Sequence, residues 1–202
     1  RVFFVSNRFG QLKQLCDLNL NDGRASLVTG DIPWDVQAVT ASHQKGLIAF
    51  SVNEGGVSTI HVRDQVTFQP KSLPTLPIGV LRSMKFGPKG EQLAVTLDSA
   101  TGPADVYAIH LQKRALIRWT KSEVGGLDTS RFVAPKLINY PTFDQVEGAP
   151  RRIPAFYYKP QRAQGPHPVL IVIHGGPESQ YRPRFWPALQ HWINDLGIAI
   201  IA

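Results

Sequence analysis

The sequence predicts the last two to three blades of a β-propeller in residues 1–135, followed by an α/β domain in residues 136–202. Three observations lead to this fold class. Apolar strand patterns recur with a period of about 45 residues, which is typical of propeller blades. The pattern changes near residue 136, and a continuous β-branched run then ends in a glycine-rich loop.

The repeat is defined by apolar strand patterns that begin at residues 2, 47 and 93. Each is followed by a polar turn and by a second strand with apolar residues at alternate positions. The Asn-Asp-Gly at residues 21–23 is a strong hairpin signal leading to a third strand. A further strand ending at residues 84–86 precedes one repeat, so each unit has four short antiparallel strands, as a blade does. A β-sandwich with coincidental spacing is the alternative.

The pattern from residue 136 onward differs from that of the repeats. We expect residues 136–150 to be a linker at the start of a new domain and residues 152–158 to be a strand. The unbroken β-branched run at residues 168–174 predicts a parallel strand covered on both faces. A helix over residues 185–196 and a second buried strand at residues 198–202 follow. The helix signals are apolar residues at helical spacing, a proline in the first turn and a glycine stop: Leu189, Trp192, Ile193, Leu196, Pro187 and Gly197.

Composition excludes several classes of protein. The formal charge of +7 is spread over the chain, with no basic run interleaved with aromatics, so no nucleic-acid partner is expected. No apolar run reaches the roughly 18 residues of a membrane helix, which predicts a soluble protein without a membrane partner, and we assign it to the cytoplasm. The single Cys16 excludes an internal disulfide and is expected to be a buried thiol. The six histidines show no metal-ligand spacing, so neither a metal nor another cofactor is expected.

The candidate site is the loop formed by His174, Gly175, Gly176 and Pro177. It follows a buried strand and precedes a helix, where open α/β sheets place their sites. In α/β-hydrolases a loop in this position donates one backbone N–H to the oxyanion of the tetrahedral intermediate. Pro177 has no N–H, so the donor is Gly175, Gly176 or Glu178, and we favour Gly176. An ordinary tight turn is the alternative, and phosphate binding is disfavoured because no phosphate-loop spacing is present.

Three segments, together with the repeats that precede them, resemble the prolyl oligopeptidase family of serine peptidases. They are residues 139–144 (Asn-Tyr-Pro-Thr-Phe-Asp), 153–160 (Ile-Pro-Ala-Phe-Tyr-Tyr-Lys-Pro) and 172–180 (Val-Ile-His-Gly-Gly-Pro-Glu-Ser-Gln). The His before Gly-Gly-Pro is most similar to the acylaminoacyl-peptidase and bacterial oligopeptidase branch. Other branches have at this position a Tyr whose hydroxyl donates to the oxyanion. The resemblance implies that residues 136–202 begin an α/β-hydrolase catalytic domain, with a backbone donor from Gly176 or its neighbour and with His174 shaping the loop.

The same resemblance implies hydrolysis of short peptides through an acyl-enzyme by a Ser, Asp and His triad. The sequence contains no Gly-x-Ser-x-Gly nucleophile motif, and the nearest match, at residues 56–60, lacks the second glycine. In this fold the triad follows the glycine-rich loop, so we expect an internal fragment that is inactive alone and continues into further blades upstream. The oligomeric state is left open. A non-catalytic propeller scaffold for protein interactions is the alternative function.

Overall fold

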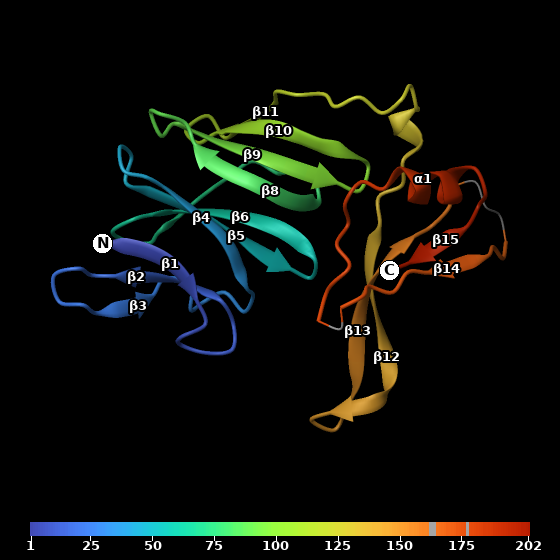
Figure 1. Ribbon diagram of the computed structural model, residues 1–202, viewed down its shortest axis with the longest axis horizontal. Helices are drawn as coiled ribbons and strands as arrows, with labels where there is room; N and C mark the ends of the chain where they lie inside the picture. The colour runs from blue at the N-terminus through green and yellow to red at the C-terminus, as the bar shows by residue number, and fades with distance from the viewer. Residues whose placement is uncertain (162–164, 177) are drawn as a thin grey trace. The chain divides into compact units, whose positions relative to one another are not determined.

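The computed structural model describes residues 1–161, 165–176 and 178–202 (Figure 1). The chain forms two compact units. The first contains Arg1–Asp98 and Ala104–Lys121, and the second contains Ser99–Pro103 and Ser122–Ala202.

Three antiparallel sheets form the first unit. The first sheet has the strand order β1-β2-β3, the second β4-β5-β6-β7 and the third β11-β10-β9-β8. In chain order the strands are β1 (Val2–Ser6), β2 (Gln14–Leu18), β3 (Ala25–Leu27), β4 (Val36–Ser42), β5 (Leu47–Glu54), β6 (Val57–Asp64), β7 (Pro70–Lys71), β8 (Gly79–Phe86), β9 (Gln92–Ser99), β10 (Gly102–His110) and β11 (Ala115–Arg118).

The predicted repeat of the strands is confirmed. The apolar patterns at residues 47–50 and 93–96 lie in β5 and β9, which are the second strands of the two four-stranded sheets. The pattern at residues 2–5 lies in β1, which is followed by two further strands just as β5 and β9 are. The sheets therefore fit two propeller blades and three strands of another.

The hairpin predicted at residues 21–23 is also confirmed. The backbone N–H of Asn19 donates to the carbonyl oxygen of Arg24 at 2.9 Å, and that of Gly23 donates to Asn19 at 2.9 Å. Gly23 has a φ of 68°, a conformation that costs glycine little because it has no Cβ. This turn sets the pairing of β2 with β3, in which Cys16 lies opposite Leu27 and is buried.

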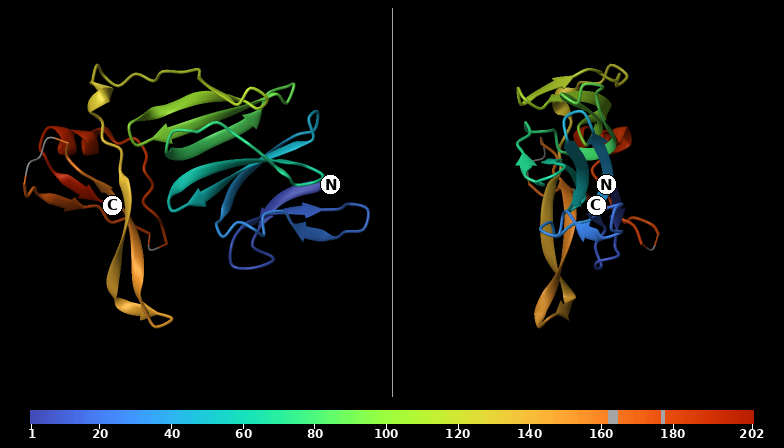
Figure 2. Two further views of the ribbon diagram at one scale, coloured as in Figure 1. Left: turned by 180° about the vertical axis from the view of Figure 1, so that it is seen from behind. Right: turned by 90° about the vertical axis from the view of Figure 1, so that its left-hand side faces the viewer.

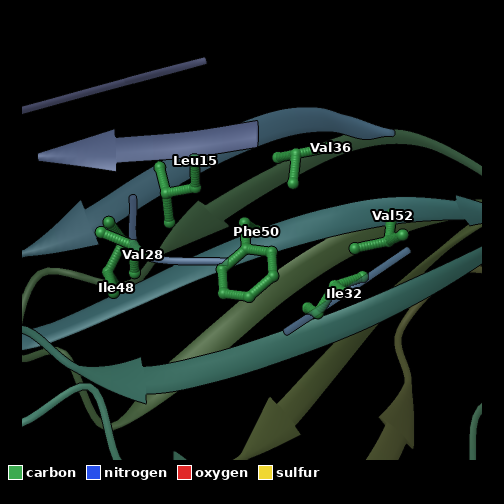
Figure 3. Close-up of a cluster of buried hydrophobic side chains, with 7 residues drawn as sticks. All are labelled: Leu15, Val28, Ile32, Val36, Ile48, Phe50 and Val52. Carbon is green, nitrogen blue, oxygen red and sulfur yellow. The ribbon is translucent and has the colours of Figure 1, made fainter. Parts of the chain in front are cut away.

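Consecutive sheets of the first unit pack face to face through two apolar clusters. Strand β5 contributes side chains to both clusters, because its side chains alternate between the two faces of the sheet. Ile48, Phe50 and Val52 point toward the first sheet, and Ala49 points toward the third. Fully burying one such large apolar side chain stabilises the fold by about 1.5–3 kcal/mol. The cluster between the first two sheets, shown in Figure 3, consists of Leu15, Val28, Ile32, Val36, Ile48, Phe50 and Val52. The cluster between the second and third consists of Ala49, Ile60, Val62, Phe86, Leu93, Val95 and Ile109.

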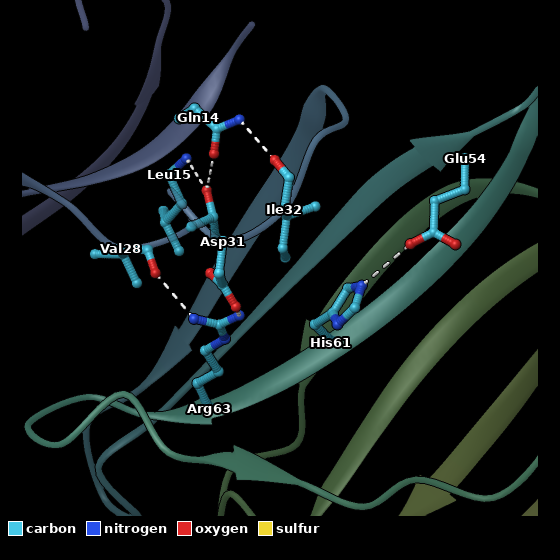
Figure 4. Close-up of polar contacts among 9 residues, drawn as sticks. Gln14, Leu15, Val28, Asp31, Ile32, Glu54, His61 and Arg63 are labelled. Atoms are coloured by element: carbon cyan, nitrogen blue, oxygen red, sulfur yellow. Dashed lines mark hydrogen bonds and ion pairs between the residues drawn. The ribbon is translucent and has the colours of Figure 1, made fainter.

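A polar link reinforces the first of these interfaces (Figure 4). Arg63 on β6 donates to the carbonyl oxygen of Val28 at 2.9 Å and to the carboxylate of Asp31 at 2.8 Å, both in the segment that follows β3. The hydrogen bond from Arg63 lowers the pKa of the Asp31 carboxyl below its usual value. The second sheet is thus tied to the first by charge as well as by apolar packing.

The second unit contains one mixed sheet of order β12-β13-β15-β14 (Figure 2). Strands β12 (Lys136–Val146), β13 (Ala149–Tyr158) and β15 (Ala199–Ile201) pair antiparallel in succession, whereas β14 (Val169–Ile171) pairs parallel with β15. A 3-10 helix, η1 (Thr129–Arg131), precedes the sheet, and α1 (Pro187–Asn194) connects β14 to β15.

The expectation of a linker at residues 136–150 is wrong, because strand β12 occupies most of this segment. Pro141 obscures the strand pattern, yet it is tolerated because β12 is an edge strand of the sheet. The turn into β13 consists of Glu147 and Gly148, whose φ values are 52° and 79°. A two-residue hairpin turn with both φ values positive usually contains Asn-Gly or Asp-Gly, so Glu-Gly gave a weak signal. The strand expected at residues 152–158 is confirmed within β13.

The burial expected for the strand at residues 168–174 is also wrong. The regular strand is only β14, and Val169, Leu170 and Ile171 are 52%, 39% and 64% exposed. Successive side chains of a strand point to opposite faces, so among the described residues neither face of β14 is well covered. It is also the edge strand on the other side of the sheet from β12. Its parallel pairing with β15 agrees with the prediction, and Ala199 and Ile200 of β15 are buried as expected.

The predicted helix is confirmed as α1. Pro187 occupies its first turn, and Leu189 and Ile193 are buried on one face. The chain leaves the helix through Gly197, which has a φ of 66°, while Leu196 is 56% exposed and lies off the buried face. The helix therefore begins and ends where its sequence signals place it, within two residues.

Candidate functional site

The glycine-rich loop lies between β14 and α1. His174, Gly175 and Gly176 are all exposed, and Pro177 lies outside the described residues. The backbone N–H of Val172, just after β14, donates to the carbonyl oxygen of Ile201 in β15 at 2.8 Å. The loop therefore begins at a fixed point beside the parallel pair of strands.

Gly176 has a backbone that other residues rarely adopt. Its φ is 151°, and a Cβ at this position would lie 2.7 Å from the backbone nitrogen of Glu178 and 3.3 Å from the Cβ of Ser179. A Cβ on Gly175 would meet no atom within 4 Å. The two glycines therefore differ, because the chain turns back tightly only at Gly176, where a side chain would force backbone atoms apart.

The ring of His174 contacts its own loop. Its Nδ1 lies 3.1 Å from the carbonyl oxygen of Gly175. A carbonyl oxygen can only accept, so this hydrogen bond requires the proton on Nδ1, and the neutral ring then has Nε2 as an acceptor. The bond restrains the peptide between Gly175 and Gly176, which agrees with a role in shaping the loop.

Two tyrosines that sequence reasoning did not single out hold the far end of the loop. The hydroxyl of Tyr181 lies 3.0 Å from that of Tyr158 on β13, and the ring of Tyr181 packs at 6.1 Å from that of Phe156. Tyr158 is 1% exposed, and burial raises the pKa of both phenols above their usual value. Both hydroxyls therefore stay protonated near neutral pH. The one signal in the sequence was a tyrosine within a strand, since a buried hydroxyl needs a partner.

A second group of polar residues surrounds the C-terminal end of α1. Asp195 accepts from Arg131 at 3.0 Å and from Nδ1 of His191 at 2.8 Å, and these hydrogen bonds lower the pKa of its carboxyl. The group borders a cavity of about 550 Å³ whose lining includes Asp128 and Asn194. The lining of this cavity comes from other segments than the glycine-rich loop.

Within residues 1–161, 165–176 and 178–202, no group of three or more His, Cys, Asp or Glu side chains is placed to hold a metal ion. None of the helices there is long and apolar enough to cross a membrane.

No protein-family model and no curated protein matches this sequence. Solved structures do match its fold. A prolyl endopeptidase superimposes with a TM-score of 0.77 at 14% identity, covering 98% of this chain and 29% of that one. Prolyl oligopeptidase B from Galerina marginata gives a TM-score of 0.79 at 14% identity, with 100% and 28% covered. The acylaminoacyl peptidase of Pyrococcus horikoshii gives 0.68 at 19% identity, with 95% and 28% covered.

The chain has the fold of the matching part of these peptidases. It spans less than a third of the length of each. At such identities the likeness concerns the fold, and the roles of His174, Gly175 and Gly176 stay predictions.

Proposed function

We propose that this chain carries the oxyanion loop of a serine peptidase and that the backbone N–H of Gly176 is one of the two donors. The observation that carries the proposal is the place of the loop. It follows β14, the third strand of its sheet in chain order, and it precedes α1. In α/β-hydrolases one oxyanion donor comes from the loop between the third strand and the first helix.

The proposed chemistry gives Gly176 and His174 separate tasks. When a serine attacks a peptide carbonyl, the carbonyl oxygen becomes an oxyanion, and donors fixed in advance at about 2.7–3.1 Å stabilise it without reorganising. Gly176 would supply such a donor because its backbone conformation turns the chain sharply. His174 would restrain the neighbouring peptide through its hydrogen bond to Gly175. The serine and the donor that follows it would come from a part of the protein outside these residues.

We also propose the domain to which each part of the chain belongs and the class of substrate. Residues 1–135 would form the C-terminal blades of a propeller, and residues 136–202 would begin the catalytic α/β-hydrolase domain. The His before the two glycines favours the acylaminoacyl-peptidase and bacterial oligopeptidase branch. A peptide is the proposed substrate class, and one matching structure of prolyl oligopeptidase B from Galerina marginata is bound to a 25mer macrocyclization substrate. The reaction that these features support is the hydrolysis of a short peptide through an acyl-enzyme.

The test compares the two glycines in the longer protein from which the chain comes. Gly176→Ala keeps the backbone N–H, but its Cβ would lie 2.7 Å from the backbone nitrogen of Glu178 and should force that N–H out of position. Because loss of one oxyanion donor costs about 100- to 1,000-fold, kcat should fall by roughly 100-fold or more. Gly175→Ala is the matched control, and its loss should be under about 10-fold because a Cβ there meets no atom within 4 Å. His174→Asn should fall between the two. Thermal melting of each variant checks that it folds.

Near-normal turnover by a folded Gly176→Ala protein would contradict the proposal. The two glycines would then form an ordinary turn. Equal large losses in both glycine variants would likewise remove the specific role of Gly176.

A further inference from the structure

The loop that carries Gly176 is attached to the sheet at both ends. At its start, Val172 donates to Ile201 of β15. At its other end, Tyr181 contacts Tyr158 of β13 through the two hydroxyls. The two attachment points are neighbours, because β13 and β15 pair with Tyr157 opposite Ile201 and with Tyr158 opposite Ile200.

The second attachment is well suited to fix a position. The 3.0 Å hydrogen bond between the hydroxyls is directional, and the contact of Tyr181 with Phe156 fixes the plane of its ring. Tyr158 is itself held rigidly, since it is 1% exposed within a strand that has partners on both sides. By contrast, His174, Gly175 and Gly176 are exposed, so packing against the sheet contributes little to their position. The geometry of the loop therefore depends on its ends.

We propose that the hydroxyl pair of Tyr158 and Tyr181 positions the glycine-rich loop, so that Tyr181 is a positioning residue for the oxyanion donor. This inference rests on the proposed function of Gly176. Tyr181 acts through the backbone of the loop and need not touch the substrate. Its loss should therefore weaken binding of the transition state and leave binding of the ground state unchanged.

The test uses Tyr181→Phe, Tyr158→Phe and the double variant in the longer protein. Each single variant keeps the ring and removes one hydroxyl. We expect kcat to fall roughly 5- to 10-fold with KM unchanged, a loss equivalent to about one hydrogen bond. The affinity for a peptidyl boronic acid, which forms a tetrahedral adduct, should fall by the same factor as kcat/KM. Because both residues make one bond, the double variant should be no worse than the poorer single variant.

Tyr140→Phe is the matched control. Tyr140 also lies in the sheet of the second unit, on β12, but it is 44% exposed. Its variant should keep the parent values of kcat, KM and boronic acid affinity.

The outcomes separate this inference from the proposed function. If Gly176→Ala abolishes turnover while both tyrosine variants keep the parent kcat, the loop is the oxyanion loop and the positioning inference is wrong. If Gly176→Ala is near normal, the proposed function fails first. A rise in KM without a fall in kcat, or additive losses in the double variant, would also overturn the positioning role.

Discussion

At the scale of single residues, His61 places an ionisable ring at the interface of the first two sheets. It lies opposite Phe50 in the pairing of β5 with β6, and the two rings stack at 5.1 Å with an angle of 11°. Burial lowers the pKa of the His61 imidazole, and Arg63 lowers it further. Glu54 opposes this shift, but its carboxylate lies 3.7 Å from Nε2, too far for a hydrogen bond.

This environment predicts how stability depends on pH. The unfolded chain binds a proton on His61 near the ordinary value of 6.5, whereas the folded chain binds it only at lower pH. The contribution of His61 is therefore fully present above that value, and the free energy of unfolding falls as the pH drops through it. His61→Gln should flatten the dependence between about pH 7.5 and 5.5, measured by urea unfolding at each pH. His43→Gln, at an exposed position, should not flatten it, and an unchanged slope in His61→Gln would contradict the prediction.

At the scale of elements, α1 is held in the second unit by a buried amide. Gln190 is 2% exposed, and its Nε2 donates to the carbonyl oxygens of Ala100 and Val133 at 3.0 Å each. Its Oε1 accepts from the backbone N–H of Val133 at 2.8 Å and from Asn194 at 3.3 Å. An amide side chain has two N–H groups and two lone pairs, so Gln190 uses its full capacity.

Replacing this amide should destabilise the unit around α1. Gln190→Leu replaces the amide with an apolar side chain of similar size. It leaves three backbone groups of Ala100 and Val133 without this partner, which should lower the free energy of unfolding by roughly 2–3 kcal/mol. Asn194→Ala, which removes only the 3.3 Å contact, should cost less than about 1 kcal/mol. Urea unfolding followed by near-ultraviolet circular dichroism measures this, since Trp192 in α1 packs at 5.3 Å from Trp186, the residue before the helix. Equal midpoints for Gln190→Leu and the parent would contradict the role of Gln190.

Elements were predictable where local chemistry decides them. The strands of the repeat follow from alternation, the hairpin at residues 21–23 from its turn residues, and α1 from Pro187 and Gly197. Strand β12 could not be predicted, because Pro141 is acceptable only on an edge strand and the sequence does not say which strand lies at an edge. The exposure of β14 was missed because a run of apolar residues does not reveal whether other elements cover the strand.

At the scale of the whole molecule, the sequence located the candidate loop but not what holds it. The position of Gly175 and Gly176 between a strand and a helix follows from local patterns. The contact between Tyr158 and Tyr181 joins residues 23 positions apart through tertiary packing, and nothing local to either tyrosine names its partner. The strain that separates Gly176 from Gly175 depends on the path of residues 178–179. Such distinctions arise from tertiary packing and not from local sequence.

The 202-residue chain taken alone should have no peptidase activity. The proposed peptidase function needs a serine presented on a Gly-x-Ser-x-Gly turn, and the sequence contains no such motif. An oxyanion loop can stabilise a tetrahedral intermediate only after a nucleophile has formed it, so Gly176 without that serine should give no acyl-enzyme. We expect no labelling by a fluorophosphonate probe and no hydrolysis of chromogenic short peptides, whereas a longer protein that supplies the serine should show both. Circular dichroism would establish that the chain is folded in the same sample. Stoichiometric labelling of a specific serine in the folded chain would show that the nucleophile lies within these residues, and the assignment of residues 136–202 to the start of a hydrolase domain would then be wrong.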